Sequence, residues 1–99
     1  MARPTKLSDA DVQQRLAELP GWTLEEGALH RELVFSDFSE AWGFMGRVAL
    51  EAERLGHHPD WCNSYNRVIV QLSTHDAGGI TELDFALARH VEKVRGQAG

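Results

Sequence analysis

Residues 37–59 have the sequence DFSEAWGFMGRVALEAERLGHHP, and this stretch contains the most strongly marked helix of the chain. Asp37 and Glu40 stand three residues apart, which is the spacing of an N-terminal capping pair. Gly56 stands where a helix C-cap glycine belongs, and Pro59 prevents the helix from resuming. Between these signals apolar residues recur at helical spacing, which predicts a buried stripe of Ala41, Phe44, Met45, Val48, Ala49, Ala52 and Leu55.

A pair of strands is predicted on each side of this helix. Before it, residues 22–24 and 28–35 are rich in strand formers, and Glu26-Gly27 between them suits a tight turn. After it, residues 61–62 and 67–74 flank a polar cluster that is typical of a hairpin connection. The alternation in the last strand predicts that one face is buried, with the side chains of Val68, Val70, Leu72 and Thr74.

Shorter signals predict a helix at each end of the chain. Ser8 and Asp11 form a capping pair for a helix over residues 8–19, and Thr81 and Asp84 form one for the last helix. The order of elements is therefore α-β-β-α-β-β-α. Paired strands favour an α+β fold, a two-layer sandwich with a four-stranded antiparallel sheet and three helices packed on one face. We expect one domain, residues 1–99, whose free sheet face or edge meets a second copy.

Composition excludes several classes of protein. The 99 residues carry 10 basic and 15 acidic side chains, a formal charge of -5, which disfavours binding to nucleic acid phosphates. The longest apolar run, from Ala41 to Gly46, is far shorter than a membrane span, and no secretory signal is visible, so we expect a cytoplasmic protein without a membrane segment. Cys62 is the only cysteine, which excludes an internal disulfide.

Three histidines stand at the ends of predicted elements. His57 and His58 leave the long helix, and His75 ends the last strand. Imidazole gives and accepts protons near neutral pH, and Glu53 lies one turn before His57, where it is predicted to hold that ring. Acid–base chemistry is one interpretation, and helix capping by the histidine pair is the other. A zinc site on the three histidines is a weaker hypothesis, because adjacent residues rarely aim both rings at one ion, and no metal is predicted.

The run Glu53-Arg54-Leu55-Gly56-His57-His58-Pro59, followed by Tyr65, Ser73-Thr74-His75 and Asp84, resembles the signature of the pterin-4a-carbinolamine dehydratases. The resemblance extends from about Leu7 to Val94. It implies an α+β sandwich that assembles as a homodimer or homotetramer. It also implies dehydration of 4a-hydroxytetrahydrobiopterin to the quinonoid dihydropterin by histidine acid–base catalysis, in tetrahydropterin recycling, without a cofactor.

The resemblance also implies roles for individual residues. The catalytic set is His57, His58 and His75 with Glu53, in which His57 and His75 exchange protons, His58 holds the pterin and Glu53 orients His57. The pterin contacts are those three histidines and the backbone around four further residues, namely Gly56, Ser73, Thr74 and Asp76. Asp84 belongs to the same pattern but is interpreted here as a helix cap.

A non-catalytic function is the alternative, because some members of the family act as dimerisation cofactors for a transcription factor. Such a function would need the long helix from Asp37 to Leu55 but not paired imidazoles with Glu53. The retained histidines therefore favour the enzyme.

Overall fold

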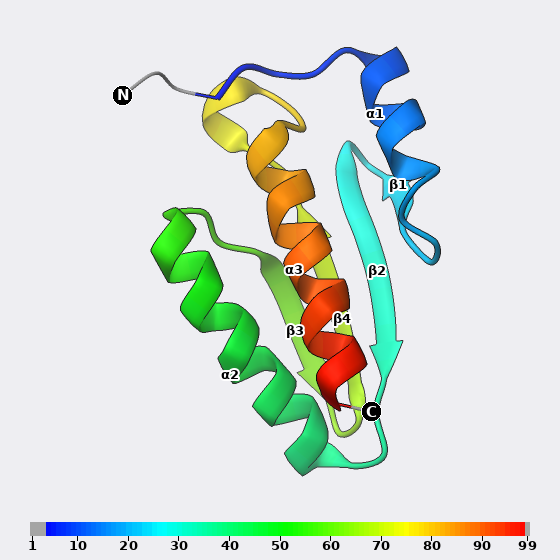
Figure 1. Ribbon diagram of the computed structural model, residues 1–99, viewed down its shortest axis with the longest axis vertical. Coiled ribbons are helices and arrows are strands. Elements are labelled where there is room, and N and C mark those ends of the chain that lie inside the picture. The colour runs from blue at the N-terminus through cyan, green and yellow to red at the C-terminus, as the bar shows by residue number, and fades with distance from the viewer. Residues whose placement is uncertain (1–3, 99) are drawn as a thin grey trace.

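The computed structural model describes residues 4–98 and confirms the predicted order of elements (Figure 1). The bounds are α1 Asp9–Leu16, β1 Thr23–Glu25, β2 Ala28–Val34, α2 Phe38–Leu55, β3 Asp60–Ser64, β4 Arg67–Leu72, the single 3-10 turn η1 His75–Ala77, and α3 Glu82–Ala98. The α+β fold class predicted from the sequence is therefore confirmed.

The four strands form one antiparallel sheet in the order β1-β2-β4-β3, so the second hairpin lies against the second strand of the first. Helices α2 and α3 lie across one face of it, and α1 lies beside β1 (Figure 1). Leu29 pairs with Leu72 and Leu33 with Val68, which places four buried side chains on the helix-covered face. They pack with Phe44 and Val48 of α2 and with residues of α3 in one hydrophobic cluster.

All three predicted helix caps are present. Ser8 Oγ accepts a hydrogen bond from Asp11 N, Asp37 Oδ1 accepts one from Glu40 N, and Asp84 Oδ2 accepts one from Thr81 N. Helix α1 nevertheless ends at Leu16, three residues before the predicted end. Leu19 N donates to Leu16 O in a tighter turn instead, which buries Leu19 and leads the chain into Pro20.

Helix α2 has the predicted buried stripe with one error. Ala41, Phe44, Val48 and Ala52 are buried, and Met45 and Leu55 are half-buried, but Ala49 is exposed. Ala49 lies toward the solvent side of α2, where Phe38, Trp42 and Leu50 are also exposed. Within residues 4–98 no helix is both long enough and apolar enough to cross a bilayer.

Strand β4 ends at Leu72 rather than at Thr74, and the residues that follow it form a defined turn. Thr74 and Gly79 pair with each other, and Thr74 O accepts hydrogen bonds from the N–H groups of Ala77 and Gly78. Gly78 takes the left-handed conformation that closes this turn, with φ of 77°. The turn places His75 at the mouth of the site described below.

The beginning of the chain is tied to α3. Leu7 N donates to Ile80 O at 2.8 Å, and Arg15 Nη1 donates to Glu82 Oε2 at 2.6 Å. The hydrogen bond from Arg15 lowers the pKa of the Glu82 carboxyl, so that this exposed pair is fully ionised at neutral pH. These contacts hold the N-terminal segment against the end of the sheet from which the functional residues project.

Candidate active site

The C-terminal end of α2 determines how the histidine pair is presented. Gly56 has φ of 66°, and its N–H donates to the carbonyls of Ala52 and Glu53. His57 N donates to Ala52 O at 3.0 Å, so the chain makes a left-handed turn that ends the helix. After this turn the ring of His57 is buried and that of His58 is exposed.

His57 is paired with a buried carboxylate from the opposite side of the cavity. Its Nε2 lies 2.5 Å from Asp84 Oδ1, and the side chains are 10% and 0% exposed. An ionised carboxylate only accepts hydrogen bonds, so the proton lies on His57 Nε2 and the neutral ring keeps Nδ1 as an acceptor. The pair therefore fixes both the orientation and the tautomer of this imidazole.

The carboxylate of Asp84 is held by two further donors. Thr81 N and Thr74 Oγ1 each donate to Asp84 Oδ2 at 2.9 Å. The two threonine hydroxyls lie 2.9 Å apart, and because the Thr74 hydroxyl uses its one proton on Asp84, the Thr81 hydroxyl donates to Thr74. A buried charge needs such a complete set of partners, and here the N-terminus of α3 and Thr74, two residues after the end of β4, supply them.

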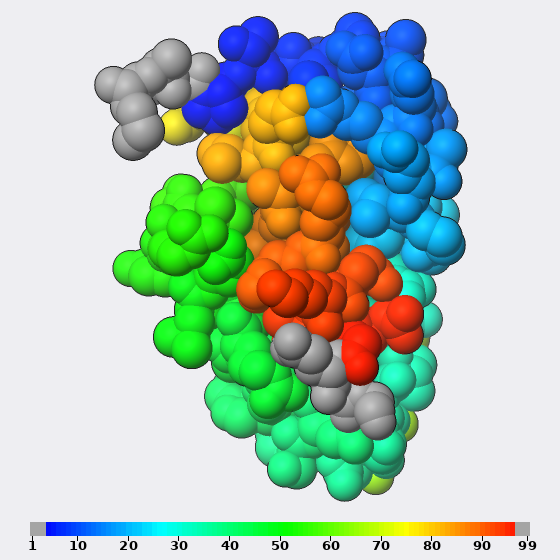
Figure 2. All heavy atoms as spheres, in the orientation of Figure 1, coloured from blue at the N-terminus to red at the C-terminus, as the bar shows by residue number. Residues whose placement is uncertain are grey.

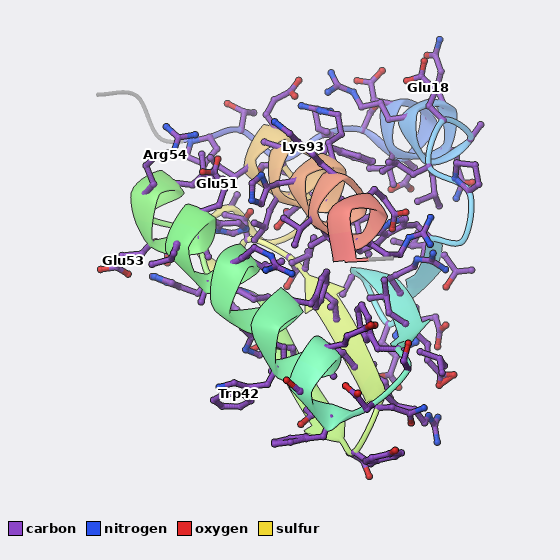
Figure 3. The ribbon with its side chains drawn as sticks, turned by 60° about the horizontal axis from the view of Figure 1, so that its bottom comes forward. Glu18, Trp42, Glu51, Glu53, Arg54 and Lys93 are labelled. Carbon is purple, nitrogen blue, oxygen red and sulfur yellow. The ribbon has the colours of Figure 1, made fainter. Side chains whose placement is uncertain are left out.

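The second pair is on the surface. Glu53 Oε1 lies 3.0 Å from His58 Nε2, with side chains 82% and 63% exposed. In Figure 3 Glu53 points away from the body of the molecule, on the side of α2 opposite α3. The predicted contact of Glu53 with His57 is therefore wrong. It required the helix to continue to His57, whereas the left-handed turn at Gly56 sends His57 inward and brings His58 back toward Glu53.

One cavity of about 190 Å³ lies between the end of α2 and the turn η1. It brings together every residue predicted to contact the substrate: Gly56, His57, His58, Ser73, Thr74, His75 and Asp76. His75 and Asp76 are exposed at its mouth, whereas Thr74 is buried in its wall. Glu53 is absent from this lining and reaches the cavity only through His58.

The family model described as "Pterin 4 alpha carbinolamine dehydratase" matches residues 5–94, which is nearly the whole chain. The chain belongs to the pterin-4-alpha-carbinolamine dehydratase family. A protein of Rhodospirillum rubrum is 53% identical over 93 residues, covering 92% of this chain and 97% of its own. A protein of Opitutus terrae is 54% identical over 92 residues, covering 92% of this chain and 95% of its own. Both carry the provisional name pterin-4-alpha-carbinolamine dehydratase.

Two solved structures superpose on this chain. A transcriptional coactivator/pterin dehydratase from Brucella melitensis superposes with a TM-score of 0.89 at 43% identity, covering 96% of this chain and all of its own. A pterin dehydratase-like protein, described as a RuBisCO assembly factor in the alpha-carboxysome, superposes with a TM-score of 0.62 at 21% identity, covering 76% and 87%. The second likeness shows that the dehydratase fold is shared, and no more than that.

The sequence analysis did not predict that Asp84 contacts His57 in the site of this dehydratase-family member. Its interpretation as a helix cap is confirmed, but the same carboxylate also bonds to His57. The capping spacing gave a sufficient reason for an acid at this position and hid the second contact. The one signal pointing to it was the position of Asp84 in the motif shared with the dehydratases.

The arrangement has the parts of a proton-transfer site. One imidazole is fixed by a buried carboxylate, a second by a surface carboxylate, and a third lies at the mouth of the same cavity. An oriented imidazole with a free ring nitrogen is a general base or acid at neutral pH. Among residues 4–98 no three His, Cys, Asp or Glu side chains converge in a way that could hold a metal ion.

Proposed function

We propose that this protein removes water from 4a-hydroxytetrahydropterins, giving the quinonoid dihydropterin in tetrahydropterin recycling. The observation that carries the proposal is the single cavity that gathers three imidazoles, one of them fixed by Asp84. The reaction breaks the C4a–O bond and the N5–H bond, forms a C4a–N5 double bond and releases the hydroxyl group as water. It needs a proton acceptor and a proton donor, and no oxidant or reductant.

The proposed roles follow from how each imidazole is held. His57 presents Nδ1 as an acceptor, so we assign it the proton of N5. His75 lies at the exposed mouth and donates the proton to the leaving hydroxyl group. His58, held by Glu53, contacts the pterin, and the backbone around Gly56, Ser73, Thr74 and Asp76 meets the polar edge of the ring. No metal or organic cofactor takes part in this proposal.

The direct test follows the decay of freshly generated 4a-hydroxytetrahydropterin by ultraviolet absorbance, with and without the protein and with EDTA present. We expect the protein to accelerate the decay by the same factor whether or not EDTA is added. No acceleration by a folded sample would contradict the proposal. Acceleration that EDTA abolishes would replace it by a metal-dependent reaction.

The exposed side of α2 supports the further proposal that the protein is a homo-oligomer. Phe38, Trp42 and Leu50 are 49%, 60% and 75% exposed there, and the rings of Phe38 and Trp42 lie 6.0 Å apart. Figure 3 shows Trp42 projecting away from the body of the molecule. The exposed residues Gly46 and Ala49 lie along α2 between Trp42 and Leu50, so a two-fold axis near them would place the aromatic end of one helix on Leu50 of a second copy.

Replacing Trp42 by glutamate is expected to shift the protein to a smaller assembly, because it puts charge in an apolar interface. The measurement is molar mass by light scattering on a size-exclusion column. Tyr65→Glu is the matched control, since Tyr65 is 63% exposed but belongs to the β3–β4 turn and not to the exposed side of α2. An unchanged mass for Trp42→Glu, or an equal shift for Tyr65→Glu, would contradict an interface on this side of α2.

A non-catalytic function on the same fold is the second candidate, and the exposed apolar side of α2 is the observation that favours it. This surface suits a helix of another protein as well as a second copy. The Brucella melitensis structure is described as both a coactivator and a dehydratase. A folded protein that leaves the decay rate unchanged but forms a stable mixed complex through α2 would establish this function in place of the enzyme.

A further inference from the structure

His57 borders two depressions of similar size. The first is the cavity of about 190 Å³ described above, and the second has about 180 Å³. They share Gly56, His57, Thr74 and Asp76. Beyond these shared residues the first is lined by His58, Ser73 and His75, whereas the second, which we call the side lobe, is lined by Pro4, Ala77 and Leu83. Apart from the shared residues, the lining of the first cavity is polar and the lining of the side lobe is apolar.

The chemistry of the side lobe suits a short, uncharged group. Pro4, Ala77 and Leu83 offer hydrocarbon surface, and the exposed Asp76 can accept hydrogen bonds from hydroxyl groups. Its lining within the described residues includes no lysine or arginine, so a phosphate or carboxylate placed there would meet Asp76 without a compensating cation. A small hydroxylated alkyl chain fits these surroundings best.

The N-terminal segment supplies a wall of the side lobe, and that wall is anchored. Leu7 is three residues after Pro4, and its N–H donates to Ile80 O at 2.8 Å. The stem of Lys6 lies on Gly79 so closely that a methyl group added to Gly79 would come within 2.8 Å of Lys6 Cε. Figure 2 shows this segment crossing the beginning of α3, above the end of α2. Two contacts thus hold Pro4 over the lobe.

We propose that the side lobe binds the substituent that the pterin carries at C6. This inference rests on the proposed function. In a pterin C6 is bonded directly to N5, the atom assigned to His57, so a group on C6 must leave the ring close to His57. The amino group on C2 of the pyrimidine ring lies at the opposite end of the bicycle from C6, toward His58 and Ser73 in the polar cavity. Pro4, Ala77 and Leu83 are then specificity-determining residues.

The test compares two substrates in the decay assay, the 4a-hydroxytetrahydropterins that carry either a methyl or a 1,2-dihydroxypropyl group at C6. Ala77→Phe fills the side lobe. It is expected to lower kcat/KM for the dihydroxypropyl substrate by about tenfold or more, a typical penalty for a misfitting group, and to change that for the methyl substrate by less than about twofold. The readout is the ratio of the two values.

Leu83→Ala removes a wall instead of filling the space, so it lowers the same ratio if Ala77→Phe fails to fold. Ala17→Phe, at an exposed alanine after α1 that lines neither depression, is the control and leaves the ratio unchanged. A folded Ala77→Phe with an unchanged ratio would overturn the inference. If the wild-type protein accelerates neither substrate, the proposed function fails instead, so the two failures are distinguishable.

Discussion

Asp84→Asn is expected to lower kcat for dehydration by about 10²- to 10⁴-fold, the range that a positioned acid–base group contributes. Thr74 Oγ1 and Thr81 N both donate to Asp84 Oδ2, so the amide oxygen of asparagine must stay there and its NH₂ group must face His57. His57 Nε2 then accepts a hydrogen bond, and the ring proton moves to Nδ1. The nitrogen assigned to the substrate can no longer take a proton. The absorbance assay measures kcat directly.

Glu53→Gln is the matched control, because it makes the same carboxylate-to-amide change at the other acid–histidine pair. Glu53 and His58 are 82% and 63% exposed, so water replaces the lost contact at little cost. We expect kcat to change by less than about threefold, as for a weak surface pair. Equal losses in the two variants, or wild-type turnover in Asp84→Asn, would contradict the assignment of His57 as the base.

The same substitution tests whether Asp84 only supports the fold. Asp84 is fully buried and caps α3, so Asp84→Asn is expected to lower the free energy of unfolding by about 1–3 kcal/mol, measured by urea titration. Asp84→Ala should cost more, since it leaves two donors without a partner. If kcat falls only in proportion to the fraction of each variant that is unfolded, Asp84 acts as a cap alone. A larger loss of kcat in fully folded protein supports the role of Asp84 in positioning His57.

Local signals in the sequence were sufficient for most of the fold. A capping pair joins two residues that are three positions apart, and helical or alternating periodicity shows which side of an element is buried. Both signals therefore depend only on residues that are close together in the sequence. The three caps and the buried residues of β4 agree with the structure for this reason. Apart from Ala49 in the middle of α2, the errors in the fold lie at element ends, as at Leu16 and Leu72, where the chain exchanges regular hydrogen bonds for turns.

The candidate site was predictable only in part. The cavity-lining residues come from two short motifs, whose likeness to the dehydratases identified them. The partner of His57 could not be derived from spacing, because Asp84 is 27 residues away and meets it only after Gly56 turns the chain. Helical spacing instead indicated Glu53 as the partner of His57, but the turn at Gly56 places His58 beside Glu53. Pro4 carried no signal, since its place over the side lobe depends on contacts with Gly79 and Ile80.

The double variant His57→Ala/His75→Ala is expected to lose catalysis entirely, so that the substrate decays at its spontaneous rate. Each single variant should lose about 10²- to 10⁴-fold in kcat, because each lacks one of the two proton-transfer groups. The losses should not add, since groups that act on one transition state depend on each other. The measurement is the decay rate as a function of protein concentration, with folding checked by circular dichroism and assembly by light scattering.

His30→Ala/His90→Ala is the control that removes the same number of imidazoles from outside the cavity. His30 lies on β2 beside Gln71, and His90 lies on α3; neither lines the cavity or the side lobe. This control should keep wild-type turnover. His57→Ala also leaves Asp84 buried without the N–H donor of His57, so His57→Gln, whose amide can donate to Asp84, separates loss of the base from loss of the fold. If the folded His57→Gln/His75→Ala variant still turns over at the wild-type rate, proton transfer does not involve these two histidines. The other outcome, a folded protein of unchanged mass with only spontaneous decay, is the one that the fixed tautomer of His57 leads us to expect.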